Sequence, residues 1–104
     1  MRIDFTGRVA VVTGAAGGIG AAICRAYAAA GARLVCVDLD AERGATLADE
    51  LRGTGAEARF VRADVADPVD VAGYVEAALA AYGRIDAFAA NAGIEGAVCA
   101  TVDY

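Results

Sequence analysis

Short apolar runs alternate with helical stretches along the 104 residues of this chain, and this alternation limits the folds open to it. Strands are predicted at Arg8–Thr13, Arg33–Asp38, Glu57–Ala63 and Ile85–Ala90. Because a single helical stretch joins each strand to the next, the strands must run parallel, with right-handed crossovers. The sequence therefore predicts one α/β domain, a doubly wound parallel sheet with the element order βαβαβαβ.

Three helices are predicted between these strands, at Gly18–Ala30, Asp40–Arg52 and Pro68–Tyr82. Asp40 and Asp67 are suited to cap the second and third helices, and a glycine follows each helix. Leu47 and Leu51 lie one turn apart on the second helix. The third helix is expected to bury five side chains at i+3 and i+4 spacing: Val69, Ala72, Val75, Leu79 and Tyr82.

The strand order expected for a doubly wound sheet is 3-2-1-4, which makes Ile85–Ala90 the last strand at one side. Residues 94–104 show no periodicity, so no further strand is predicted there. The strand at Ile85–Ala90 would then be an apolar edge with open backbone groups. We therefore expect the isolated chain to be poorly stable and prone to associate.

The composition excludes several kinds of chemistry. Lysine, histidine and serine are absent, so the chain can build no Ser-His or Cys-His nucleophile pair, no histidine metal site and no Schiff base. With a net charge of −5, the chain offers neither the basic surface that binds nucleic acid nor a polybasic segment that would anchor it to a membrane. The longest uncharged run, Val9–Cys24, is shorter than the roughly 20 residues of a membrane span, and the N-terminus lacks the apolar core of a secretion signal.

The chain has three widely spaced cysteines, Cys24, Cys36 and Cys99. An odd number at such spacing favours a reducing, cytoplasmic environment over a disulfide framework. We expect these side chains to serve as small buried apolar groups.

A glycine-rich turn joins the first strand to the first helix, with the pattern T-G-x-x-x-G-x-G at Thr13, Gly14, Gly18 and Gly20. Gly14 permits a sharp turn, Gly18 lets a pyrophosphate approach the backbone, and Gly20 lets the helix pack closely on the strand. The free N–H groups and the positive end of the helix dipole would bind the anion. The alternative is a glycine-rich turn that holds no ligand.

Asp38 ends the second strand, where an acidic residue would bind the hydroxyls of a nucleotide ribose. Its alternative role is a cap at the end of the strand. With these residues, the chain resembles the short-chain dehydrogenase/reductase family, and the resemblance extends from Gly7 to Tyr104. Four markers carry the resemblance in order: the glycine pattern, Asp38, Asp64-Val65 and Asn91-Ala92-Gly93.

The resemblance implies a Rossmann-type sheet and a role for each marker. The backbone of Ile19 would contact the pyrophosphate, and Asp38, with Leu39 beside it, would accept hydrogen bonds from the adenosine ribose. Asp64 would accept from the adenine amino group, and the Val65 N–H would bond the ring. Asn91, Ala92 and Gly93 would line the nicotinamide-side ribose. The alternatives are ordinary strand-end residues at 64–65 and a simple turn at 91–93.

The family's catalytic Ser, Tyr-x-x-x-Lys and further Asn have no counterpart in this chain, so the resemblance assigns no catalytic residue here. Its tyrosines lack a lysine four residues later, and we expect Tyr27, Tyr74 and Tyr82 to pack on the sheet. The family's chains are more than twice as long. We therefore interpret these residues as the N-terminal cofactor-binding half of such an enzyme. The sequence does not distinguish a fragment from a truncated gene product or an incomplete sequence.

The resemblance implies an NAD-dependent oxidoreductase that transfers a hydride between NAD(H) and an alcohol or ketone, and that forms a homo-oligomer when full length. NAD is expected over NADP, because Asp38 and the nearby Asp40 would repel a 2′-phosphate. Arg43, the nearest base, is expected to be solvated on the following helix. A non-enzymatic dinucleotide-binding module remains the alternative. A flavodoxin-like phosphoacceptor is disfavoured, since it needs an acidic cluster after the first strand and a later lysine.

Overall fold

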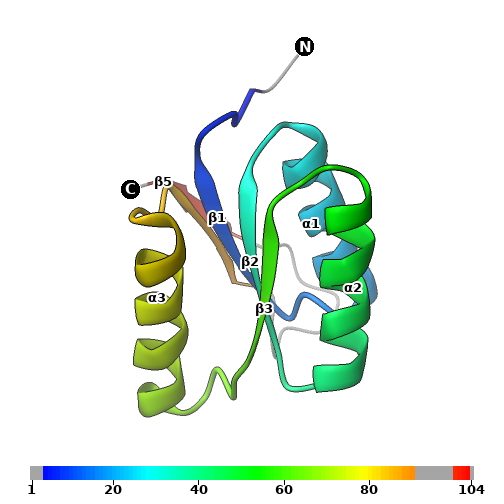
Figure 1. The fold of residues 1–104 in the computed structure, drawn as a ribbon. Helices are drawn as coiled ribbons and strands as arrows, with labels where there is room; N and C mark the ends of the chain where they lie inside the picture. Colours follow the sequence, from blue (N-terminus) through cyan, green and yellow to red (C-terminus); the bar gives the residue numbers. More distant parts are fainter. Residues whose placement is uncertain (1–3, 91–99, 104) are drawn as a thin grey trace.

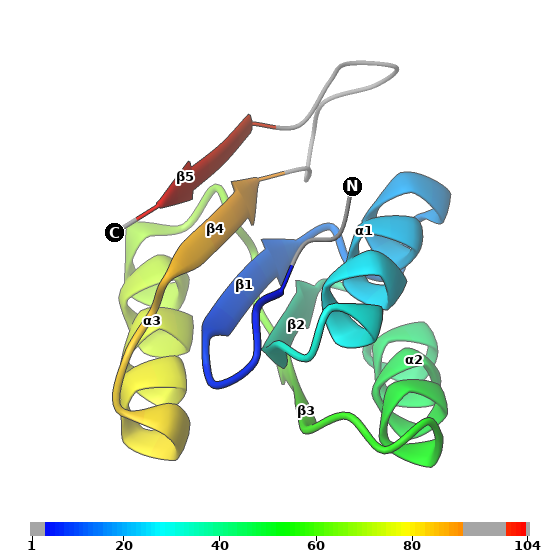
Figure 2. The same ribbon diagram turned by 90° about the horizontal axis from the view of Figure 1, so that it is seen from above.

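The computed structural model describes residues 4–90 and 100–103 and contains a five-stranded sheet in the order β3-β2-β1-β4-β5 (Figure 2). The strands are β1 (Val9–Thr13), β2 (Arg33–Asp38), β3 (Ala58–Arg62), β4 (Ala87–Ala90) and β5 (Ala100–Asp103). The first four are parallel, as the sequence predicts. The order 3-2-1-4 of these four strands is also confirmed.

The fifth strand was not predicted. β5 pairs antiparallel with β4, and Ala87 lies opposite Asp103. The strand was missed because four residues are too few to show a period-two pattern. Antiparallel pairing of two successive strands also needs no crossover helix, so no other element of the sequence indicates it. The expectation that β4 forms an open edge is therefore wrong, and the association expected from that edge loses its basis.

Helices cover both faces of the sheet (Figure 1). α1 (Gly18–Ala29) and α2 (Ala41–Gly53) lie on one face, and α3 (Pro68–Tyr82) lies on the other. Side chains alternate along β2 between the two core layers, so that Leu34 and Cys36 face α1 and α2 while Val35 and Val37 face α3. The fully buried β1 lies between both layers, as a nearly continuous apolar strand should.

The buried face of α3 differs from the predicted one. Val69 is 77% exposed and Leu79 is 46% exposed, whereas Tyr74 and Ala78 are buried. Val71, Val75 and Tyr82 pack beside these two buried residues. The helix is apolar on nearly every side, so its sequence defines the orientation poorly. The Tyr74 ring packs against Phe88 of β4 at 6.0 Å between centroids, which turns the helix away from the predicted face.

The predicted caps are confirmed. The Asp40 carboxylate accepts a hydrogen bond from the Arg43 N–H at 3.0 Å, and that of Asp67 accepts one from the Val69 N–H at 2.9 Å. Gly83 ends α3 with a φ of +77°. No helix in the described part of the chain is long and apolar enough to cross a membrane.

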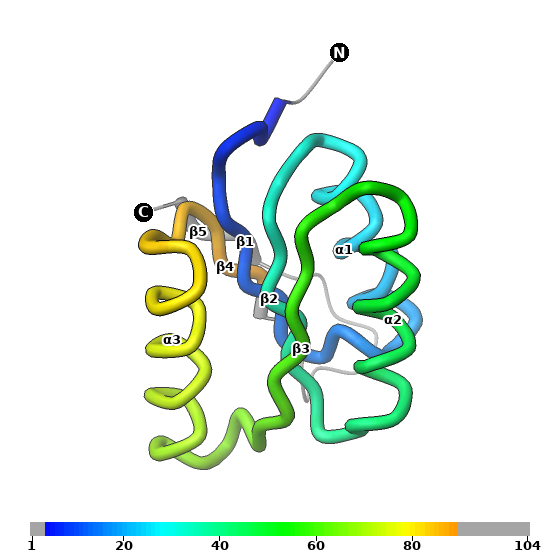
Figure 3. Tube along the Cα trace, in the orientation of Figure 1, coloured from blue at the N-terminus to red at the C-terminus, as the bar shows by residue number. Residues whose placement is uncertain are grey.

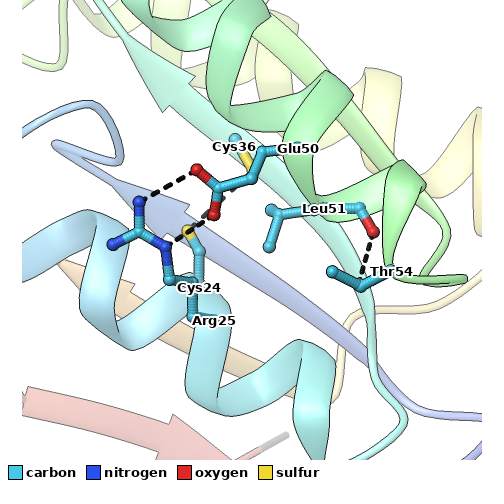
Figure 4. Close-up of polar contacts among 6 residues, drawn as sticks. All are labelled: Cys24, Arg25, Cys36, Glu50, Leu51 and Thr54. Carbon is cyan, nitrogen blue, oxygen red and sulfur yellow. Dashed lines mark hydrogen bonds and ion pairs between the residues drawn. The ribbon is translucent and has the colours of Figure 1, made fainter.

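Two of the cysteines lie in the core between α1 and β2 (Figure 4). Cys24 and Cys36 are free and fully buried, with their sulfur atoms 3.9 Å apart. Contact with Cys36, together with burial, raises the pKa of the Cys24 thiol. Both side chains therefore act as the predicted small apolar groups, while Cys99 lies outside the described residues.

Candidate dinucleotide-binding site

The β1–α1, β2–α2 and β3–α3 connections gather at one end of the sheet, drawn at the bottom of Figures 1 and 3. This is the carboxyl end of the parallel strands, where open α/β sheets bind ligands. A hollow of about 350 Å³ opens there. It is lined by Gly14, Asp38, Leu39, Ala63, Asp64, Val65 and Ala66. Five of the residues singled out from the sequence are thus brought together.

The glycines of the turn serve three different needs. Gly14 has a φ of +67°, which only glycine adopts readily. A Cβ on Gly20 would lie 1.9 Å from the carbonyl oxygen of Gly14, so the close contact is with the turn's own backbone rather than with the strand. A Cβ on Gly18 would meet no atom within 4 Å, which leaves open space above the start of α1.

The N-terminus of α1 is uncapped, unlike that of either other helix in the described residues. Gly17 occupies the cap position and supplies no side chain, and the first turn contains no acidic residue. The first intrahelical bond runs from the Ala21 N–H to the Gly17 carbonyl at 2.8 Å, so the N–H groups of residues 18–20 precede the hydrogen-bond ladder. Together with the dipole of α1, these groups suit an anion. Ile19, which is 49% exposed, lies among them.

Asp38 lies between the turn and the hollow. One carboxylate oxygen accepts a hydrogen bond from the Ala16 N–H at 2.9 Å, and the other accepts one from the Asp40 N–H at 2.9 Å. Each oxygen keeps a further lone pair that can accept from a ribose hydroxyl. The bond to Asp40 is the strand-end cap predicted as the alternative role, and it leaves this acceptor capacity in place.

Asp64 and Val65 form the opposite wall of the hollow. One Asp64 carboxylate oxygen accepts from the Ala66 N–H at 2.9 Å, and the Asp64 N–H donates to Asp70 at 2.8 Å. These bonds fold the backbone after β3 into a turn. Asp64 is exposed at the rim, and the half-buried Val65 packs against the α3 core layer.

Thr13 is buried at the end of β1, and Leu39 is 54% exposed at the mouth of the hollow. Asn91, Ala92 and Gly93 lie outside the described residues. Among the residues that the structure describes, no cluster of His, Cys, Asp and Glu side chains could hold a metal ion.

A second hollow, of about 330 Å³, lies between α1 and α2 beside the glycine turn. Two hydrogen bonds, of 2.7 and 3.1 Å, join the Arg25 guanidinium to the Glu50 carboxylate in its wall (Figure 4). The pair raises the pKa of Arg25 and lowers that of Glu50. Arg43 lines the same hollow as Gly17 and Gly18, and it is exposed on α2, as the sequence predicts.

Sequence reasoning missed Ala16 and Ala66. Ala16 and Ala66 act through backbone N–H groups, so their side chains carry no signal. The Asp64-x-Ala66 spacing is that of an Asx turn and could have indicated the second contact. No local pattern indicates the first, because it joins residues far apart in the sequence.

The model of the family described as short chain dehydrogenase matches residues 8–102. This chain belongs to the short-chain dehydrogenase family. D-threitol dehydrogenase of Mycolicibacterium smegmatis is 49% identical over an alignment of 98 residues, which covers 90% of this chain and 38% of that enzyme. Cis-4-hydroxycyclohexanecarboxylate dehydrogenase of Sinomonas cyclohexanicum is 49% identical over 90 residues, covering 86% of this chain and 36% of that enzyme. The chain thus spans well under half the length of these curated relatives.

Solved short-chain dehydrogenases share the fold. One from Burkholderia phymatum in complex with NAD superposes with a TM-score of 0.80 at 40% identity, over 83% of this chain and 31% of that one. A metagenomic short-chain oxidoreductase in complex with NADP gives a TM-score of 0.82 at 40% identity, over 86% and 41% of the two chains. Membership of this family and the Rossmann-type fold are thereby confirmed.

Proposed function

We propose that this short-chain dehydrogenase chain binds NAD(H) and serves an oxidoreductase that acts on an alcohol or carbonyl substrate. The arrangement of Asp38 carries the proposal, because its carboxylate lines the hollow at the strand ends while the uncapped start of α1 lies beside it. A nicotinamide cofactor bound there would accept or donate the hydride. The chain's own residues would hold and orient that cofactor.

The components of a dinucleotide fit the residues present. The pyrophosphate would lie over Gly18 and Ile19, where a Cβ on Gly18 would meet no other atom. Asp38 would hold the adenosine ribose, and Asp64 and Val65 would contact the adenine. Thr13, Gly14 and Gly20 would shape the turn. Asn91, Ala92 and Gly93 are proposed for the nicotinamide-side ribose from the sequence resemblance alone.

We propose a preference for NAD over NADP on grounds of charge. A 2′-phosphate beside Asp38 would meet a carboxylate that already orders two backbone N–H groups. The nearest cation, Arg43, lines the other hollow, between α1 and α2. The solved relatives include one with NAD and one with NADP, so membership of the family leaves the preference open.

The catalytic residues are proposed to lie outside these 104 residues, which lack Ser and Lys. The described tyrosines pack against the sheet, with Tyr27 9% exposed and Tyr74 3% exposed. Burial raises the pKa of the partly buried Tyr82, so an even smaller fraction of its hydroxyl is ionised at neutral pH and able to act as a base. The 104 residues alone are therefore expected to show no turnover.

Titration of the intact enzyme with NADH and NADPH tests the proposal, together with an assay of NAD reduction by that enzyme over a panel of alcohols. NADH should bind more tightly than NADPH, and Asp38→Ala should reduce this difference in affinity. Equal or tighter NADPH binding by the parent chain would contradict the preference. NADH binding by the intact protein without turnover on any substrate would favour the alternative, a non-enzymatic dinucleotide-binding module.

A further inference from the structure

Asp38 is attached to the glycine turn by its side chain. The Ala16 N–H donates to Asp38 Oδ2 at 2.9 Å, across 22 positions of sequence. Ala16 is 8% exposed, so water has little access to that N–H if the carboxylate is removed. The contact therefore joins the middle of the turn to the end of β2.

The neighbouring N–H groups of the turn are held by backbone acceptors. The Ala15 N–H donates to the Val37 carbonyl at 3.1 Å, and the Gly17 N–H donates to the Gly14 carbonyl at 3.2 Å. Of three consecutive N–H groups, that of Ala16 alone depends on a side chain. The donors offered to an anion begin at the next residue, Gly18.

The carboxylate itself is held on its other side. Asp38 Oδ1 accepts from the Asp40 N–H at 2.9 Å, and the Asp38 carbonyl accepts from the Ala63 N–H at 3.2 Å. These contacts fix the side chain relative to β2 and β3. A charge held in this way can position the turn, because a hydrogen bond to an ionised acceptor is stronger than one to a neutral acceptor.

We propose that Asp38 is a positioning residue for the pyrophosphate subsite as well as the acceptor for the ribose. The inference rests on the proposed function and deepens it. Asp38 orients the turn through Ala16 and so aligns the N–H groups at the start of α1. Replacing Asp38 should therefore weaken both cofactors through the misaligned turn, while the loss of the ribose contact and of the repulsion of a 2′-phosphate narrows the difference in affinity between NADH and NADPH.

The test uses a probe that cannot contact Asp38 through ribose hydroxyls, 2′,3′-dideoxyadenosine 5′-diphosphate. Binding of this probe to the full chain is compared for the parent, Asp38→Ala and Asp40→Ser. If Asp38 served the ribose alone, its removal would leave probe affinity unchanged or raise it, because a carboxylate repels the diphosphate. If Asp38 positions the turn, Asp38→Ala should lower the affinity for the probe about tenfold.

Asp40→Ser is the matched charge control. It removes a neighbouring carboxylate, yet a serine can still accept from the Arg43 N–H at the start of α2. Its probe affinity should equal or slightly exceed that of the parent. Asp38→Asn, which keeps one acceptor oxygen, should recover part of the loss. Parent-like binding of the probe by Asp38→Ala would overturn the inference.

Amide hydrogen exchange without ligand gives a second, independent readout. Asp38→Ala should speed exchange at Ala16 and leave the centre of β1 protected, and unchanged exchange at Ala16 would also overturn the inference. If the parent bound neither NADH nor NADPH, the proposed function would fail, while exchange at Ala16 would still decide the positioning role. If the parent bound NADH and Asp38→Ala kept its probe affinity, the inference alone would fail.

Discussion

Gly18 and Gly20, at the start of α1, lack a side chain for different reasons. A Cβ on Gly20 would lie 1.9 Å from the Gly14 carbonyl oxygen, whereas a Cβ on Gly18 would meet nothing within 4 Å. Gly18 leaves open space where the proposed pyrophosphate would lie, whereas Gly20 leaves room for the chain itself. Substitutions at the two positions should therefore affect different properties.

We expect Gly18→Ala to preserve the free energy of unfolding, or to raise it by a few tenths of a kcal/mol, while weakening NADH binding at least tenfold. Gly20→Ala should destabilise the fold by about 2 kcal/mol or more, because the backbone of the turn must move. Chemical denaturation and NADH titration of both variants check this. If Gly18→Ala bound NADH as tightly as the parent, the pyrophosphate would not lie over Gly18.

Asp86, just before β4, joins the first and fourth strands. Its Oδ2 accepts from the Val9 N–H at 2.8 Å, its Oδ1 accepts from Arg84 at 2.6 Å, and its own N–H donates to the Val9 carbonyl at 2.8 Å. The fourth strand predicted from the sequence, Ile85–Ala90, includes Asp86. The structure starts that strand at Ala87, because Asp86 pairs with the start of β1 through its side chain as well as its backbone.

Asp86→Ala should lower the free energy of unfolding by about 1–3 kcal/mol, because the N–H of the fully buried Val9 loses its acceptor. Asp86→Asn keeps an acceptor oxygen and should cost less. Urea denaturation of the two variants beside the parent measures the difference. Equal stability of Asp86→Ala and the parent would show that water replaces the carboxylate.

At the scale of elements, the packing of α2 on the sheet depends on a glycine. A Cβ on Gly44 would lie 2.0 Å from the ring of Phe60 on β3, so the helix lies closer to the sheet than a larger residue allows. Gly73, in the middle of α3, would place its Cβ in open space. The two glycines form a matched pair of helical positions with opposite surroundings.

Gly44→Ala should destabilise the protein by about 1–3 kcal/mol, since Phe60 or α2 must shift. Gly73→Ala should stabilise it by about 0.5–1 kcal/mol through helix propensity alone. Thermal unfolding of both variants gives the sign of each change. If Gly44→Ala melted above the parent, the close approach of α2 to β3 would be disproved.

At the scale of the whole molecule, stability should depend on pH mainly on the acid side. Arg84 and the Val9 N–H lower the pKa of Asp86, Arg25 lowers that of Glu50, and bonds to Thr6 lower that of Asp4. Each group releases its proton more readily in the folded state. Its contribution is therefore complete above the unfolded pKa of about 4 and disappears as the pH falls through the lower folded value.

The midpoint of thermal unfolding should stay nearly constant from about pH 7 to pH 5, because the chain has no histidine, and should fall below about pH 4. Glu50→Gln should make that fall shallower, since one of the shifted groups is gone. Differential scanning calorimetry over this range measures both. A midpoint that rises on acidification would contradict the stated sign.

Local signals in the sequence predicted the order of the first seven elements, the parallel strands, the caps at Asp40 and Asp67 and five of the seven residues that line the hollow at the strand ends. Such signals suffice because a cap or a glycine turn is formed by residues a few positions apart. The α/β alternation likewise leaves few topologies open. The family resemblance rested on the same short motifs.

Tertiary structure alone decided the buried face of α3, the pairing of β5 with β4, the clash that excludes a side chain at Gly20 and the bond from Ala16 to Asp38. Each involves groups whose meeting depends on how whole elements pack. An apolar, alanine-rich helix such as α3 has almost no preferred face from its sequence alone, and the contact of Tyr74 with Phe88 on β4 decides which face is buried. A backbone N–H such as that of Ala16 has no sequence signature. It meets its acceptor, Asp38, only because the fold places the end of β2 beside the turn.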